Sequence, residues 1–129
     1  MQKAILCVDD EKMVLDSLKA QLKKNFGNRY MLEFAQSADE AWEVINELSD
    51  DVKMLLIVSD WLMPETKGDE FLIEVHQHYP QIVKVMLTGQ ADQVAIERAQ
   101  DQANLYRYLA KPWAEGELVE TIQDGLERS

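Results

Sequence analysis

The chain has 129 residues, of which 47% are hydrophobic and 29% are charged, and its formal net charge at pH 7 is −11. This length suits one domain, and the apolar fraction excludes an intrinsically disordered chain. Because the binding of nucleic-acid phosphates requires a basic face, we expect no direct contact between this acidic chain and nucleic acid. The single cysteine excludes an internal disulfide and suits the cytoplasm. No apolar run approaches the roughly 20 residues that span a bilayer, so we expect no membrane segment.

Five apolar runs of strand length alternate along the chain with five segments of helical periodicity. The predicted strands are 4–8, 30–35, 54–58, 82–87 and 106–110. Cys7 lies inside the first run, where we expect it to be a small buried hydrophobe. The five helices are predicted from apolar residues that recur at the spacing of one helix face. In the first helix these are Val14, Leu15, Leu18, Leu22 and Phe26, and in the second they are Ala38, Ala41, Trp42, Ile45 and Leu48. The third helix has Phe71, Leu72, Val75 and Tyr79, the fourth has Val94, Ala95, Ala99 and Ala103, and the fifth has Leu118, Val119, Ile122 and Leu126.

Several helix ends carry their own signals. Gly27 suits the C-cap of the first helix, and S-A-D-E at 37–40 is a capping box that opens the second. Pro80 stops the third helix, and the fourth is expected to begin near Asp92. We expect Gly68 to permit a turn that other residues resist.

The order of the elements predicts the fold class. Strands that alternate with helices form a parallel sheet with right-handed crossovers and helices on both faces. Residues 54–58 are apolar throughout, which is typical of a strand buried on both faces. The carboxyl ends of all five strands then lie at one edge, where open α/β sheets bind their ligands.

Polar side chains stand at four of these strand ends: Asp9 and Asp10, then Asp60, Thr88 and Lys111. Clustered carboxylates repel one another, and such sites usually hold a divalent cation or raise a pKa. Oxygen ligands suit Mg²⁺ or Mn²⁺. Asp60 is a candidate nucleophile for phosphoryl transfer, with Lys111 to neutralise phosphoryl charge and Thr88 to donate a hydrogen bond. Taken alone, the acidic pair after the first strand would also suit an ordinary helix start.

Four motifs together resemble the receiver domain of bacterial two-component response regulators. They are V-D-D-E at 8–11, S-D-W-L-M-P at 59–64 with Gly68, L-T-G at 87–89 and Y-L-A-K-P-W at 108–113. The match spans the chain in order, at the ends of the first, third, fourth and fifth strands. The resemblance implies a flavodoxin-like (βα)5 fold with strand order 2-1-3-4-5. It also implies one receiver domain over residues 1–129, either complete or the N-terminal part of a longer regulator.

The resemblance assigns roles at the strand ends. Asp60 would accept a phosphoryl group from a phosphohistidine of a sensor kinase or a phosphotransfer protein. Asp10 and Asp60 would ligate Mg²⁺ directly with the backbone carbonyl of Leu62, and Asp9 would act through water. Lys111 would contact the phosphoryl group together with Thr88. The peptide bond between Lys111 and Pro112 would be cis.

The resemblance also implies a switch. Thr88 would be drawn to the phosphoryl group and Tyr108 would swing inward, although an aromatic residue in an edge strand is also compatible with simple packing. The output face would comprise the fourth helix, the last strand and the last helix, and would contact an output domain, a target protein or a second copy of the chain. Leu62 and Gln90 would border the water that hydrolyses the phosphoryl group, and we expect the bulk of Leu62 to lengthen the phosphorylated state.

Two other functions fit part of the pattern. A phosphohydrolase of the haloacid dehalogenase type also uses an aspartate nucleophile with Mg²⁺, but it needs an acid where this chain has Leu62. A docking domain that works without phosphorylation would tolerate loss of the strand-end residues, and none is lost. We expect His76 and His78 to be surface residues and no metal pair. Trp61 and Trp113 flank the site as loop packing or as partner anchors.

Overall fold

The structure is a computed structural model that describes residues 1–89 and 93–128. Within these residues the elements are β1 (Gln2–Val8), α1 (Lys12–Phe26), β2 (Met31–Ala35), α2 (Ala38–Glu47), β3 (Val52–Asp60), α3 (Gly68–His78), β4 (Val83–Thr88), α4 (Gln93–Gln102), β5 (Arg107–Ala110) and α5 (Glu115–Glu127). The strands form one parallel sheet in the order β2-β1-β3-β4-β5. The predicted flavodoxin-like fold with strand order 2-1-3-4-5 is confirmed. The predicted start of the fourth helix at Asp92, and Gln90, lie outside the described residues.

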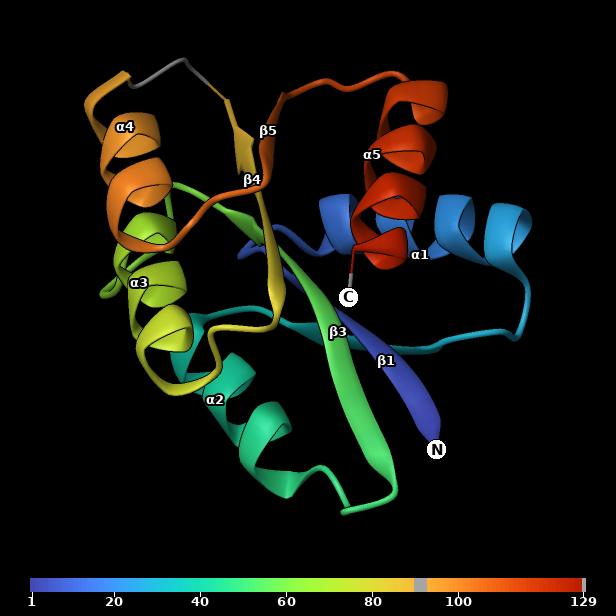
Figure 1. Ribbon diagram of the computed structural model, residues 1–129. Helices are drawn as coiled ribbons and strands as arrows, with labels where there is room; N and C mark the ends of the chain where they lie inside the picture. The colour runs from blue at the N-terminus through green and yellow to red at the C-terminus, as the bar shows by residue number, and fades with distance from the viewer. Residues whose placement is uncertain (90–92, 129) are drawn as a thin grey trace.

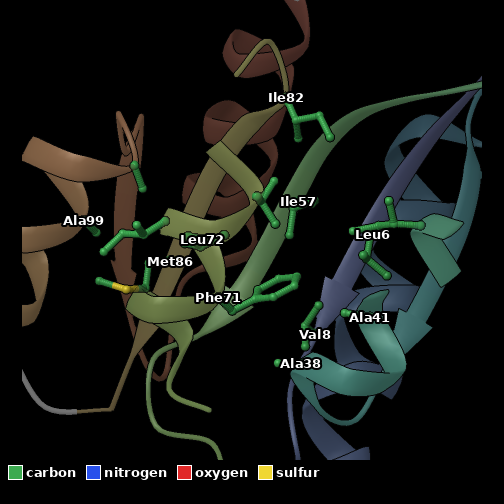
Figure 2. Close-up of a cluster of buried hydrophobic side chains, with 14 of the residues drawn as sticks. Leu6, Val8, Ala38, Ala41, Ile57, Phe71, Leu72, Ile82, Met86 and Ala99 are labelled. Carbon is green, nitrogen blue, oxygen red and sulfur yellow. The ribbon is translucent and has the colours of Figure 1, made fainter. Parts of the chain in front are cut away.

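Helices cover both faces of the sheet, with α1 and α5 on one face and α2, α3 and α4 on the other (Figure 1). Each face therefore has its own hydrophobic core. The core under α2, α3 and α4 includes Leu6, Ile57, Phe71 and Met86 (Figure 2). In the described part of the chain, no helix is long and apolar enough to cross a bilayer.

The central strand β3 is longer than its apolar core suggests. Every residue from Met54 to Asp60 is buried, because β1 and β4 flank the strand and helices cover both its faces. Asp60 is the last residue of this strand, and the residue is 4% exposed. The other predicted strands shift by one or two residues at an end, as strand limits commonly do. Asp60 is therefore a buried carboxylate at the end of the central strand.

Helix α4 is held to the molecule by few and small side chains. Its buried residues are Ala95, Ile96 and Ala99. The prediction that Val94 belongs to the buried face is wrong, because this side chain is 74% exposed and Ile96 occupies the core instead. Since two of the three buried side chains are alanines, α4 removes little apolar area from water. By comparison, α1 buries three leucines and Phe26.

Gly68 has a different role from the predicted one. The positive φ of the loop before α3 falls on Glu65, at 68°, and not on the glycine. Gly68 is instead required because α3 begins directly against the end of β3: a Cβ at this position would overlap the carbonyl oxygen of Asp60. The amide of Gly68 also donates to the carbonyl oxygen of Trp61 at 2.7 Å. This glycine therefore fixes the first turn of α3 against the strand end.

A lysine lies inside the core of the α3 side. Lys84, on β4, is only 1% exposed, and its Nζ lies 2.9 Å from Nδ1 of His76 and 3.4 Å from the carbonyl oxygen of Pro80. His76 is half-buried because of this contact, and His78 is exposed as predicted. Burial lowers the pKa of Lys84 to about 8. Burial, and secondarily the charge of Lys84, also lower the pKa of His76.

We predict that the free energy of unfolding of the wild-type chain rises relative to that of Lys84→Met as the pH increases from 8 to 10. At Lys84 the unfolded chain keeps a proton through this window and the folded chain loses it, because the pKa is lowered from 10.5 to about 8 on folding. The expected relative gain is about 2 kcal/mol, and Lys84→Met should be the more stable protein at pH 7. The raised pKa of Cys7 acts in the opposite direction, but it is common to both proteins and cancels in the comparison. Urea unfolding of both proteins at pH 7, 8, 9 and 10 measures the difference. Parallel pH profiles would contradict the burial of a charged amine.

Candidate functional site

The polar residues at the strand ends lie together at the carboxyl edge of the sheet. Asp60 and Thr88 are the last residues of β3 and β4, while Asp9 and Lys111 directly follow β1 and β5. Asp60 is in register with Leu87, one residue before Thr88, so neighbouring strands end at nearly the same level. The parallel sheet thus brings together residues that are up to 102 positions apart in sequence.

Lys111 connects the carboxylates. Its Nζ lies 2.7 Å from Oδ2 of Asp9 and 3.1 Å from Oδ1 of Asp60. Its main-chain amide donates to the carbonyl oxygen of Thr88 at 2.8 Å, which fixes the start of the loop that carries the amine. The peptide bond between Lys111 and Pro112 is cis. One ammonium group therefore sits between two buried acidic groups.

The surroundings of Asp60 disfavour the charged form of its carboxyl group. Burial, and then repulsion from Asp9, raise the pKa of Asp60 to about 6 against the opposing effect of Lys111. Burial alone would lower the pKa of Lys111, but its contacts with Asp9 and Asp60 outweigh burial and raise it. The site thus pairs a fully charged amine with a carboxylate whose charge is incompletely compensated.

Three aspartates form a group that could hold a metal ion. One carboxylate oxygen from each of Asp9, Asp10 and Asp60 lies within 4.8 Å of the others. Asp9 is fully buried and accepts a hydrogen bond from the amide of Glu11 at 2.8 Å, whereas Asp10 is exposed. Oxygen-only donors of this kind suit Mg²⁺ or Mn²⁺. The residues present therefore fit a hard divalent cation.

A pocket of about 590 Å³ opens beside Asp60. Leu62 lines it and is 59% exposed, so its side chain stands at the mouth of the site. Glu11, the last residue of the V-D-D-E motif, also lines the pocket, 4.0 Å from the amine of Lys111, although the resemblance assigned it no role. Trp61 lies on the same wall, with the amine of Lys67 5.6 Å from its ring centroid.

The two proposed switch residues are on neighbouring strands, with different exposure. Thr88 is 2% exposed at the end of β4, and the ring of Tyr108 on the edge strand β5 is 44% exposed. Tyr108 is in register with Met86, so its side chain emerges on the face of the sheet that α4 covers. Tyr108 and Thr88 therefore lie on the same face of the sheet, with Tyr108 partly exposed to solvent and Thr88 buried.

Trp113 is explained by packing. Its Nε1 donates to Oε1 of Gln21 at 2.8 Å, which ties the loop after β5 to α1. The tryptophan also packs against the core under α1 and α5. The packing alternative predicted for this residue is confirmed.

Comparison with known proteins identifies the family. A family model described as the response regulator receiver domain matches residues 5–123. The hydrogenase transcriptional regulatory protein HoxA of Cupriavidus necator is 33% identical over 126 residues, which cover 98% of this chain and 24% of HoxA. A chemotaxis protein CheY homolog of Campylobacter jejuni is 29% identical over 124 residues, which cover 95% of this chain and 91% of that protein.

A solved structure gives the same result. The signal receiver domain of an HD domain-containing protein from Pseudomonas fluorescens Pf-5 superimposes with a TM-score of 0.89 and 31% identity, covering 98% of this chain and 96% of that one. The chain belongs to the response regulator receiver domain family. Receiver domains are phosphoacceptor switches of two-component signalling, regulatory domains that bind Mg²⁺ in an acidic pocket and are not classical enzymes. The chain spans about a quarter of the length of HoxA.

We predict that Mg²⁺ raises the melting temperature of the protein and that Asp10→Asn removes most of this effect. A ligand that binds only the folded state stabilises it by mass action. Asp10 is the informative position because it is exposed and has no ion pair among the described residues, so its loss should leave the metal-free fold intact. Thermal unfolding in EDTA and in millimolar MgCl₂ measures the difference.

Asp16→Asn is the matched control, since Asp16 is an exposed aspartate on α1 outside the acidic group. It should retain the wild-type response to Mg²⁺. A full response in Asp10→Asn would remove Asp10 from the set of ligands.

Proposed function

We propose that Asp60 is the phosphoacceptor of this receiver domain and that a phosphohistidine of a sensor kinase or a phosphotransfer protein is the donor. The observation that carries the proposal is the buried carboxylate of Asp60 at a strand end, 3.1 Å from the amine of Lys111 and within the acidic group. Asp9 forms the shorter ion pair with Lys111, at 2.7 Å, and does not line the open pocket, whereas Asp60 does.

In this proposal a carboxylate oxygen of Asp60 attacks the phosphorus atom. The new O–P bond forms as the N–P bond to the donor imidazole breaks, and the imidazole nitrogen leaves with the electron pair. Lys111 neutralises charge on the transferred group, and Thr88 donates its hydroxyl hydrogen to a phosphoryl oxygen. The chain thereby catalyses its own phosphorylation and later its own dephosphorylation.

The proposed metal ligands are Asp10, Asp60 and the carbonyl oxygen of Leu62, with Asp9 acting through water. Mg²⁺, or Mn²⁺ in its place, would supply positive charge to the phosphoryl oxygens. In this proposal the exposed Asp10 binds the cation directly, and the buried Asp9 holds the amine of Lys111 in position.

The proposed switch runs from Thr88 to Tyr108, whose exposed ring would move inward when the hydroxyl of Thr88 turns to the phosphoryl group. The output face is α4, β5 and α5, and its partner is an output domain, a target protein or a second copy of the chain. We propose that residues 1–129 act as one receiver domain in the cytoplasm. The net charge of −11 argues against direct binding to nucleic acid.

The phosphoacceptor is tested by intact mass after incubation with Mg²⁺ and acetyl phosphate or a phosphorylated kinase. The wild-type chain and the Asp16→Asn control should each gain one phosphate-sized increment, and Asp60→Asn should gain none. An increment that persists in Asp60→Asn would overturn the assignment, because another side chain would then carry the phosphoryl group.

The lifetime of the phosphorylated state should depend on Leu62. This side chain lines the pocket beside Asp60 and is 59% exposed, so its bulk borders the approach of a hydrolytic water. We predict that Leu62→Asn speeds autodephosphorylation several-fold, which corresponds to about 1 kcal/mol of barrier. Decay of the phosphorylated protein in Mg²⁺ without a phosphatase measures it, and Leu62→Met, similar in size and unable to orient water strongly, should decay at the wild-type rate. Unchanged or slower decay in Leu62→Asn would refute obstruction.

A further inference from the structure

A partly buried ion pair joins α3 to α4. Nη1 of Arg98, on α4, lies 3.0 Å from Oδ2 of Asp69, in the first turn of α3. The side chain of Asp69 is 7% exposed and that of Arg98 is 40% exposed. Glu70 lies farther from the same guanidinium nitrogen, at 4.0 Å, and is 50% exposed. The pair with Asp69 is therefore the closer and the better shielded of the two.

Asp69 depends on this arginine for its compensation. Its other oxygen, Oδ1, is buried and has no hydrogen-bond partner among the described residues. Removing one member of a buried pair leaves an uncompensated charge, which strongly favours any arrangement that keeps the pair closed. Because Asp69 is the buried member, its charge is best compensated in the arrangement of the two helices that keeps Arg98 within reach.

The same turn of α3 is fixed to the proposed phosphorylation site. Gly68 precedes Asp69 directly, packs without room for a Cβ against the carbonyl group of Asp60, and donates to the carbonyl oxygen of Trp61. Covalent and hydrogen-bonded contacts therefore lead from the end of β3 through the first turn of α3 to Arg98. This connection bypasses Thr88 and Tyr108.

The apolar side chains that α4 buries are small. It buries one isoleucine and two alanines, as described above. Tyr108 emerges on the face of the sheet that α4 covers, in register with Met86, which packs in the same core as Ile96. A ring that moved inward from this position would come closer to α4 and would favour a different placement of α4 relative to α3.

We propose that the Asp69–Arg98 pair is a strap that holds α4 against α3 in the arrangement with Tyr108 exposed, and that it opposes the switch. The proposal rests on the proposed function, because it assumes that phosphorylation at Asp60 moves Tyr108 inward. A contact made only in one arrangement lowers the affinity for any ligand that favours the other. Arg98 and Asp69 are thus positioning residues, which touch no reacting atom.

The strap predicts an effect of unusual sign. Beryllofluoride is an anionic phosphoryl mimic, and Arg98→Gln removes a positive charge, so electrostatics alone would leave its affinity unchanged or weaken it. The strap hypothesis predicts the opposite: about fivefold tighter binding in Mg²⁺, a modest coupling between linked sites. Amide exchange across Gln93–Gln102 without beryllofluoride should also become faster.

The experiment titrates beryllofluoride in Mg²⁺ against the wild-type chain, Arg98→Gln, Arg98→Lys and Lys24→Gln, followed by amide exchange. Lys24→Gln is the matched control, because it removes the same charge from an ion pair that also joins two helices, with Glu115 at 3.2 Å, but is exposed. We expect Arg98→Lys to lie between Arg98→Gln and the wild type, since a lysine can still reach the carboxylate. It also tests the strap if Arg98→Gln fails to fold.

The outcomes separate the two proposals. Unchanged or weaker binding in both Arg98 variants, as in Lys24→Gln, would overturn the strap and leave the phosphoacceptor assignment in place. A wild-type chain that binds no beryllofluoride, or that binds it equally after Asp60→Asn, would overturn the proposed function and the strap with it. Tighter binding restricted to the Arg98 variants supports both.

Discussion

The contact on which the site depends is the ammonium group of Lys111 between the carboxylates of Asp9 and Asp60. In the sheet order β2-β1-β3-β4-β5 the lysine reaches from beyond the edge strand β5, past β4, to the acids at the ends of β3 and β1. Without this amine, two buried carboxylates and a neighbouring third would face one another uncompensated. The amine of Lys111 offsets part of this repulsion, and the remaining negative charge of the three aspartates can attract a cation.

Main-chain contacts hold this charge arrangement in place. The amide of Trp61 donates to the carbonyl oxygen of Leu87, and the amide of Lys111 donates to that of Thr88, both at 2.8 Å. Gly68 closes the other side by seating α3 on the end of β3. The carboxylate of Asp60 therefore stands on regular elements of the fold, which is the condition for a site whose geometry must be reproducible.

The two faces of the sheet differ in the side chains that their helices bury. The core under α1 and α5 contains large aliphatic side chains. The opposite core includes alanines of α4, and beside it lie the buried polar groups Lys84 and Asp69. Few apolar contacts make a helix inexpensive to displace, whereas a partly buried ion pair makes its resting position well defined. A switch needs both properties in the same element.

The sequence by itself determined the order of elements, the parallel sheet and the strand-end residues, because apolar periodicity and strand ends are local properties. The strand order is not a local property, and it followed only from the resemblance to receiver domains. It could not show that Lys111 bonds Asp9 as well as Asp60, since that contact joins residues 102 positions apart. Nor could it show why position 68 is glycine: the reason is the nearby carbonyl of Asp60, not the backbone angle. The buried Lys84 and the exposed Val94 reversed the expectation from residue type, because only the packing of α3 and α4 on the sheet decides which side chains lose contact with water.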